Sequence, residues 1–139
     1  MARTTLTPVA LVRDAGVAIG SGATPDAVNG NIVASPGPYH AKIMVKNADS
    51  ATHTLKLRSA SYTGVASGAA NSSMLAPQNT VFTQGTVGDL SVTVAAGATE
   101  VVEITTTDRF TQVDGSMWLD WDASTSMTVW VLTEPYVVA

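Results

Sequence analysis

The sequence has no cysteine, and this absence excludes two kinds of structural support. No disulfide can stabilise the fold, and no thiolate can hold a zinc ion. The two histidines, His40 and His53, are too few for a tetrahedral zinc site, which needs four ligands. They stand near the starts of two predicted strands, where they could be cross-strand neighbours, and we interpret them as surface or interface residues. The sequence therefore predicts no metal and no other cofactor.

Charge is also scarce in this chain. Charged residues make up 13% of the sequence, which is about half of the usual share. The 7 basic residues are outnumbered by 11 acidic ones, the net charge is −4, and the basic residues are spread along the chain. Those that could gather on one sheet are Lys42, Lys46, Lys56 and Arg58. Each neutralised phosphate needs its own cation, so we expect no nucleic-acid partner. So little charge favours coverage of part of the surface by a protein.

Long apolar runs are missing as well. No segment approaches the roughly 20 apolar residues that a membrane helix requires. The first residues, Met1-Ala2-Arg3-Thr4-Thr5, are not followed by the apolar stretch of a signal peptide. We therefore expect a protein that is synthesised in the cytoplasm, is not secreted and has no membrane partner.

Helical patterns are nearly absent, and alternation of apolar and polar residues takes their place. No apolar spacing of three and four residues persists beyond two turns, whereas period-two alternation recurs between turn residues. In residues 39–47, for example, Ala41, Ile43 and Val45 face one way. The predicted strands are residues 9–12, 31–34, 39–47, 52–60, 90–95, 100–106, 116–122 and 127–133.

These strands predict an all-β fold. Residues 39–47 and 52–60 are expected to form an antiparallel hairpin, because the Asn and Asp of residues 47–50 favour a tight turn. The number of strands and the short turns between them favour an antiparallel β-sandwich or a jelly-roll-like single domain.

Two stretches interrupt the alternation and set the domain organisation. Residues 1–38 are expected to be an extended N-terminal arm and loop with one or two strands, because residues 14–38 hold five glycines and three prolines. Residues 39–139 are expected to form the β-sandwich domain, with a long loop insertion at 59–88 that has no charged residue. A loop this long is often functional, so we expect it to pack on its own sandwich or on a neighbouring molecule.

No set of residues supports catalysis. Asp120 and Asp122 leave one strand on the same side as Trp118, and parallel carboxylates do not flank a substrate. A calcium site would need more oxygen ligands from other loops, so we interpret the two acids as exposed or paired with Lys or Arg. The sequence contains neither a phosphate-binding glycine motif nor a nucleophile elbow. We therefore expect no enzyme activity.

Several short motifs follow one another in a distinctive order. Residues 5–13 read Thr-Leu-Thr-Pro-Val-Ala-Leu-Val-Arg, and residues 23–30 read Ala-Thr-Pro-Asp-Ala-Val-Asn-Gly. Residues 90–99 carry Leu-x-Val-x-Val-Ala-Ala-Gly-Ala-Thr, and residues 109–115 carry Arg-Phe-x-Gln-x-Asp-Gly before an aromatic strand. This order resembles the capsid decoration (cement) and minor capsid proteins of tailed bacteriophages. The resemblance covers the N-terminal 35 residues and the C-terminal half, and it leaves out residues 59–88.

The resemblance implies a β-rich structural virion protein, made in the host cytoplasm, that binds the outer surface of a phage capsid. Its partner would be the major capsid protein, whose subunits several copies, expected as a homotrimer, would bridge and stabilise. Two alternatives are a carbohydrate-binding β-sandwich displayed on a virion, which would use Trp118, Trp130 and the Asp120/Asp122 pair, and a tail or head–tail component.

The interface is expected on the N-terminal arm, on the 59–88 insertion and on a face that carries Trp118 and Trp130. Both tryptophans alternate with the apolar core set, so each is either an interface anchor or a rim residue, whereas Trp121 is expected in the core. Deletion of residues 1–13 is expected to abolish capsid binding and to leave the sandwich folded. The candidate interface residues are Leu6, Pro8, Leu11, Arg13, Tyr62, Phe82, Trp118 and Trp130.

Overall fold

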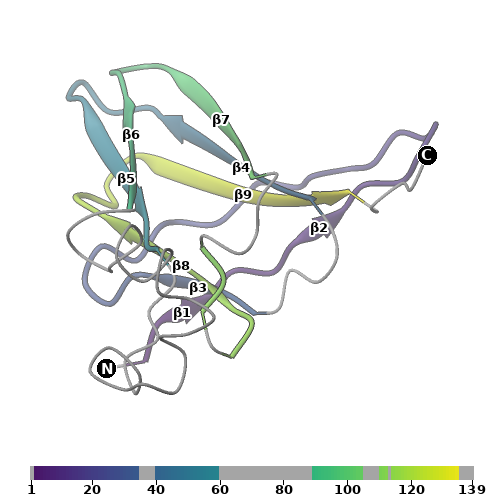
Figure 1. Cartoon of the computed structure of the whole chain (residues 1–139). Helices are drawn as coiled ribbons and strands as arrows, with labels where there is room; N and C mark the ends of the chain where they lie inside the picture. Colours follow the sequence, from purple (N-terminus) through teal and green to yellow (C-terminus); the bar gives the residue numbers. More distant parts are fainter. Residues whose placement is uncertain (1, 35–39, 60–88, 105–109, 113, 135–139) are drawn as a thin grey trace, which may run out of the picture.

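The computed structural model describes residues 2–34, 40–59, 89–104, 110–112 and 114–134, which contain nine strands and no helix (Figure 1). The strands are β1 (Thr4–Thr5), β2 (Val9–Ala10), β3 (Asn31–Val33), β4 (His40–Asn47), β5 (His53–Leu57), β6 (Leu90–Val94), β7 (Thr99–Ile104), β8 (Met117–Trp121) and β9 (Met127–Glu134). The eight strands predicted from alternation are confirmed, with ends that differ by a few residues. β1 was not predicted.

The strands form two mixed sheets rather than purely antiparallel ones. The five-stranded sheet has the order β1-β3-β8-β5-β6, and the four-stranded sheet has the order β2-β9-β4-β7. β1 runs parallel to β3 and β2 runs parallel to β9, while the other pairs are antiparallel. The expectation of an all-β chain is therefore confirmed, and the N-terminal strands are what make the sheets mixed.

One core lies between the two sheets and gives the fold a sandwich-like arrangement. Burial alternates along β8 and β9 as the sequence pattern predicts, because successive side chains of a strand point to opposite faces. Trp121 is buried in this core, as expected. The buried side chains are Leu6, Val33, Ala41, Ile43, Val45, Leu55, Leu57, Val94, Ile104, Phe110, Met117, Leu119, Trp121, Met127, Val129 and Val131.

The predicted hairpin of residues 39–47 and 52–60 is wrong, because β4 and β5 lie in different sheets. β4 pairs with β7 and β9, whereas β5 pairs with β6 and β8. β6 and β7 also belong to different sheets, as do β8 and β9. The chain therefore crosses between the sheets at these three short connections.

Asn47 explains the first of these crossings. Its side chain is fully buried, and its Nδ2 donates to the carbonyl oxygens of Ala51, at 2.7 Å, and Val94, at 3.0 Å. Its Oδ1 accepts from the backbone N–H of Asp49 at 2.9 Å. Asn47 thus connects the end of β4 to the end of β6 in the opposite sheet, and the chain turns into that sheet instead of folding back on β4.

Two smaller expectations are wrong for the same reason. His40 lies opposite Glu134 and His53 lies opposite Val94, so the two histidines are not cross-strand neighbours. Lys42 and Lys46 belong to the four-stranded sheet, whereas Lys56 belongs to the five-stranded sheet. The basic residues therefore do not gather on one sheet.

The N-terminal residues lie along the edges of both sheets. β1 extends the five-stranded sheet beside β3, and β2 extends the four-stranded sheet beside β9. Between them, Leu6 is only 4% exposed and joins the core. The backbone N–H of Leu6 donates to the carbonyl of Ile32 at 2.8 Å, and that of Leu11 donates to the carbonyl of Thr133 at 2.7 Å. This part of the predicted arm is built into the fold.

Candidate interaction surface

The outer face of the four-stranded sheet carries an apolar row that crosses three strands. Met44 of β4 lies directly opposite Trp130 of β9 on one side and opposite Val101 of β7 on the other. Strand alternation turns all three side chains away from the core. Val101 is 55% exposed, and Met44 and Trp130 are half-buried. We call these three residues the apolar row.

Charged and polar groups, together with Leu132, flank the apolar row. On one side, Lys42 lies opposite both Leu132 and Glu103, and its Nζ donates to Glu134. This hydrogen bond raises the pKa of Lys42, so the ammonium stays charged. On the other side, Lys46 is exposed between Thr128 and Thr99. An apolar centre with a polar rim is the usual anatomy of a protein interface.

Trp130 is held in place by the N-terminal chain. Its Nε1 donates to the carbonyl oxygen of Gly20 at 3.1 Å. Gly22 has a φ of +77° and lies so close to the indole that a Cβ there would clash with Trp130. One edge of the ring is therefore fixed, which lowers the entropy lost when a partner contacts the indole.

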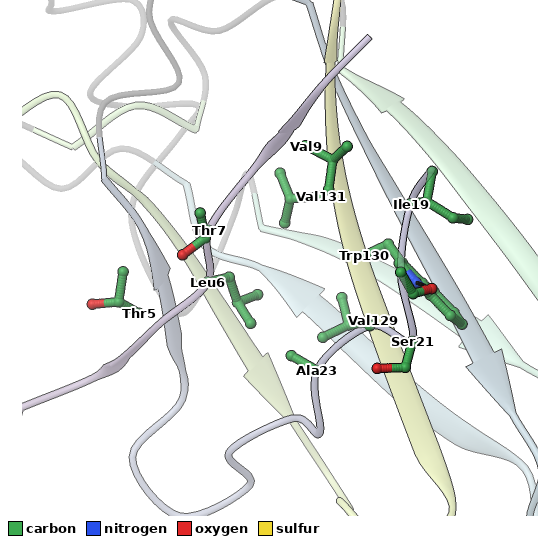
Figure 2. Close-up of a pocket in the computed structure, with 12 residues that line it drawn as sticks. Thr5, Leu6, Thr7, Val9, Ile19, Ser21, Ala23, Val129, Trp130 and Val131 are labelled. Carbon is green, nitrogen blue, oxygen red and sulfur yellow. Dashed lines mark hydrogen bonds between the residues drawn. The ribbon is translucent and has the colours of Figure 1, made fainter. Parts of the chain in front are cut away.

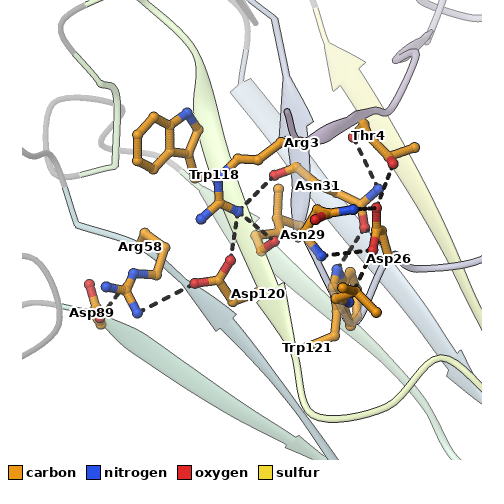
Figure 3. A network of polar contacts seen from close by, with 12 residues as sticks. Arg3, Thr4, Asp26, Asn29, Asn31, Arg58, Asp89, Trp118, Asp120 and Trp121 are labelled. Atoms are coloured by element: carbon orange, nitrogen blue, oxygen red, sulfur yellow. Dashed lines mark hydrogen bonds and ion pairs between the residues drawn. The ribbon is translucent and has the colours of Figure 1, made fainter. Parts of the chain in front are cut away.

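The outer face of the five-stranded sheet is different, because its arginines pair with aspartates (Figure 3). Arg3 donates to Asp120 Oδ1 at 2.6 Å, and Arg58 lies 3.4 Å from Asp120 Oδ2 and 3.5 Å from Asp89. The Arg3 guanidinium also lies over the ring of Trp118, 4.6 Å from its centroid. This face is a network of internal contacts.

The network ends beside β1 in a polar cluster around the buried Asn31. Asn31 is fully buried, and its Oδ1 accepts from Trp121 Nε1 at 2.8 Å and from the backbone N–H of Asp26 at 2.9 Å. Asp26 accepts from the backbone of Asn29, at 2.9 Å, and from Thr4 Oγ1, at 2.6 Å. These bonds lower the pKa of Asp26 to about 2, with the backbone bond from Asn29 as the largest cause. The cluster fixes the entry of the chain into β3.

A groove of about 370 Å³ lies beside β9 (Figure 2). It is lined by two passes of the N-terminal chain and by β9. The first pass contributes Thr5, Leu6, Thr7 and Val9, the second contributes residues 19–23, and β9 contributes Val129, Trp130 and Val131. Ala23 bonds the edge of β9 at Val129 in both directions, with N···O distances of 2.9 and 2.8 Å, while β2 pairs with Leu132 and Thr133. The groove therefore separates the two passes where they cover the edge of β9.

The predicted interface residues lie in several different environments. Leu6 is in the core, Pro8 and Leu11 are half-buried, and Arg13 is exposed beside Asp14. Tyr62 and Phe82, with the rest of the insertion from residue 60 to 88, lie outside the described residues.

The expected face that carries both Trp118 and Trp130 does not exist, because the two tryptophans lie on the outer faces of different sheets. Asp120 is paired with arginine, in agreement with the interpretation of the two acids. Asp122 accepts from the backbone N–H of Thr54 at 3.0 Å and lies 3.4 Å from His53 Nδ1. Trp118 and the two acids therefore have partners within the chain.

Met44, Val101 and Arg3 were missed as surface residues of interest. Alternation already turned Met44 and Val101 outward, and an outward apolar residue on each of two strands was the available signal. Their alignment with Trp130 depends on strand register, which the wrong hairpin obscured. The position of Arg3 depends on the parallel pairing of β1, for which two residues give no sequence signal.

Among the described residues, His, Cys, Asp and Glu side chains form no group of three that could hold a metal ion. The described part of the chain also has no helix of the length and apolarity needed to cross a membrane. In comparisons with family models, curated proteins and solved structures, no match to the chain was found.

Proposed function

We propose that this protein is a structural component of a bacteriophage virion that binds the outer surface of the capsid and bridges its major capsid subunits. The order of the sequence motifs suggests this class of protein. The observation that carries the proposal is the apolar row of Trp130, Met44 and Val101 with its charged rim. Trp and Met are enriched at protein interfaces, and a patch of this kind fits a protein partner better than a small substrate.

The mode of action would depend on contact area and copy number. Buried apolar surface contributes roughly 25 cal/mol per Å² before the costs of association are subtracted. A single contact through three strands would be weak on that scale. Several copies that bind one lattice act together, and their combined affinity exceeds that of each contact by orders of magnitude. A homotrimer, which the resemblance of the motifs implies, would provide this multivalency.

We also infer that the fold is a variant of the jelly roll. The sheet orders β2-β9-β4-β7 and β3-β8-β5-β6 supply eight strands, and from β3 to β9 the chain changes sheet at every connection except β5 to β6. Eight strands in two facing sheets with such crossings are typical of jelly rolls. The parallel pairing of β2 with β9 departs from that pattern. The connection from β5 to β6 contains the expected insertion.

The direct test is binding to capsid shells assembled from the major capsid protein of the same genome. The purified protein should co-sediment with the shells to a saturating ratio and raise the temperature at which they disassemble. An unrelated protein of similar size and charge is the control for trapping in the pellet. Absence of co-sedimentation at any concentration would contradict the proposal, and binding to a glycan array instead would favour the carbohydrate-binding alternative.

A further inference from the structure

Residues 2–11 occupy a position that later parts of the described chain provide. β1 pairs with β3, β2 pairs with β9, and Leu6 fills the core between them. Arg3 reaches Asp120, and Thr4 donates to Asp26. All of these partners lie at residue 26 or later. The position is therefore formed by described residues from Asp26 onward, and residues 2–11 are its occupant.

The connection that follows is held only lightly. Val12 is 59% exposed, and the side chains of Arg13 and Asp14 are 73% and 94% exposed, with 3.9 Å between their closest charged atoms. Figure 1 shows this stretch, between β2 and β3, running out beyond the ends of the strands and back. The groove in Figure 2 separates residues 5–9 from the return pass at residues 19–23. Residues 2–11 could thus leave without disturbing Gly20, Gly22 or Trp130.

The turn at the tip of this connection is strained. Asp14 has a φ of +56°, a left-handed conformation that non-glycine residues adopt at a cost. The side chain is 94% exposed, so its own packing does little to hold this conformation. A strained hinge next to a detachable element favours the exchange of that element between copies, since extension of the hinge relieves the strain.

We propose that residues 2–11 are exchanged between copies of this chain, with residues 13–15 as the hinge. In the exchanged form, β1, Leu6 and β2 of one copy occupy the position on a second copy, and every contact described above is retained across the two chains. The nine residue steps from Leu11 to Gly20 span up to about 30 Å when extended, which is enough to reach an adjacent copy. A closed ring of exchanges would produce a small homo-oligomer. This inference does not depend on capsid binding.

The absence of cysteine allows a direct test by disulfide formation. Thr5 lies opposite Ile32 in the parallel β1–β3 pair, and neither side chain is buried. The double variant T5C/I32C should form a disulfide, which verifies the register. Separate T5C and I32C chains, unfolded together, refolded and oxidised, should then form a covalent heterodimer. The heterodimer yield should rise with protein concentration, because exchange is an association. T5C mixed with S91C, on the far edge of the same sheet, is the control for random collisions.

Two variants of Asp14 test whether the backbone conformation of this turn controls the exchange. Asp14→Pro cannot adopt a positive φ and should raise the heterodimer yield, whereas Asp14→Gly adopts it without strain and should lower the yield. The expected ratio between the two is about tenfold or more at equal concentration. The proposal is overturned if the double variant forms its disulfide only within one chain and the mixed single variants give no more dimer than the S91C control. Equal yields from the two hinge variants would overturn the assignment of the hinge.

Discussion

Asn31 is an example of a residue whose importance no alternation pattern reveals. Its amide accepts from the core indole of Trp121 and from the backbone of Asp26, and it donates to the carbonyl of Thr4 at 3.1 Å. One side chain thus links β1, the turn that precedes β3 and the core. A buried donor that loses its acceptor keeps the full cost of desolvation, so these bonds are worth more than exposed ones.

Replacement of Asn31 by alanine should therefore be costly. It would leave Trp121 Nε1 and the Asp26 N–H without acceptors, and we expect the free energy of unfolding to fall by about 2–4 kcal/mol. Urea unfolding followed by tryptophan fluorescence measures this change. Asn29→Ala is the control, because it removes only the 3.3 Å bond from the Asn29 side chain to Asp26, keeps the backbone bond, and should cost less than about 1 kcal/mol. Equal losses for the two variants would show that the Asn31 bonds contribute no special stability.

His53 adds a pH-dependent contact between two crossings of the chain. Its Nε2 lies 2.8 Å from Asp49 Oδ2, in the β4–β5 connection, and its Nδ1 lies 3.4 Å from Asp122, which follows β8. The hydrogen bond to Asp49 is the main cause that raises the pKa of His53 above 6.5, and the charge of Asp122 adds to it, although burial opposes both. The same hydrogen bond lowers the pKa of Asp49.

The sign of the pH effect follows from the raised pKa. A group whose pKa is higher in the folded state stabilises the fold fully below its unfolded pKa of 6.5, and this contribution is lost as the pH rises through the folded pKa. The difference in unfolding free energy between the wild type and His53→Gln should thus be larger at about pH 5.5 than at about pH 9. An NMR titration of the imidazole should give a pKa above 6.5. A difference that stays constant or grows with pH would contradict the role of His53.

At the scale of strands, the sequence was informative about position and uninformative about pairing. The sequence located eight strands, and period-two alternation gave the buried side of the six from residue 39 onward, because burial on one face leaves a local signal. The partner of a strand leaves no such signal. The residues 47–50 carry the composition of a hairpin turn, yet the buried amide of Asn47 bonds to β6 and directs the chain across the core. The apolar row was hidden for the same reason, since it exists only through register.

The contribution of the N-terminal strands to the fold was also underestimated, and this affects the choice of variants for a binding test. Deletion of residues 1–13 would remove β1, β2, the core residue Leu6 and the Arg3–Asp120 ion pair together. The expectation that the sandwich stays intact without these residues is therefore unsupported by the packing. With such a truncation, loss of folding could not be distinguished from loss of binding, so point substitutions are better tests.

Leu6 provides the substitution that measures this contribution. Leu6→Ala should lower the free energy of unfolding by about 2–5 kcal/mol, because it removes buried methyl groups and leaves a cavity between the sheets. Val12→Ala, in the exposed connection, should change it by less than about 0.5 kcal/mol. Chemical unfolding of both variants gives the comparison. A loss for Leu6→Ala as small as that for Val12→Ala would mean that the N-terminal segment contributes little to the core.

At the scale of the whole molecule, the two outer faces differ in what they offer to a partner. On the five-stranded sheet, the arginines, aspartates and Trp118 make contacts within the chain. The four-stranded sheet presents the apolar row inside a charged rim. This asymmetry gives the sandwich-like fold one face suited to another protein surface, and it is the basis of the proposed capsid contact.

The central claim is tested most directly by the affinity of two matched variants for capsid shells. Val101→Asp places a charge in the apolar row on edge strand β7, and Thr93→Asp places the same charge on edge strand β6 of the other sheet, where Thr93 is exposed. A carboxylate in a desolvated interface costs about 2 kcal/mol or more, so Val101→Asp should weaken binding at least about tenfold while Thr93→Asp binds like the wild type. Unchanged binding by Val101→Asp, or an equal loss for both variants, would contradict the account.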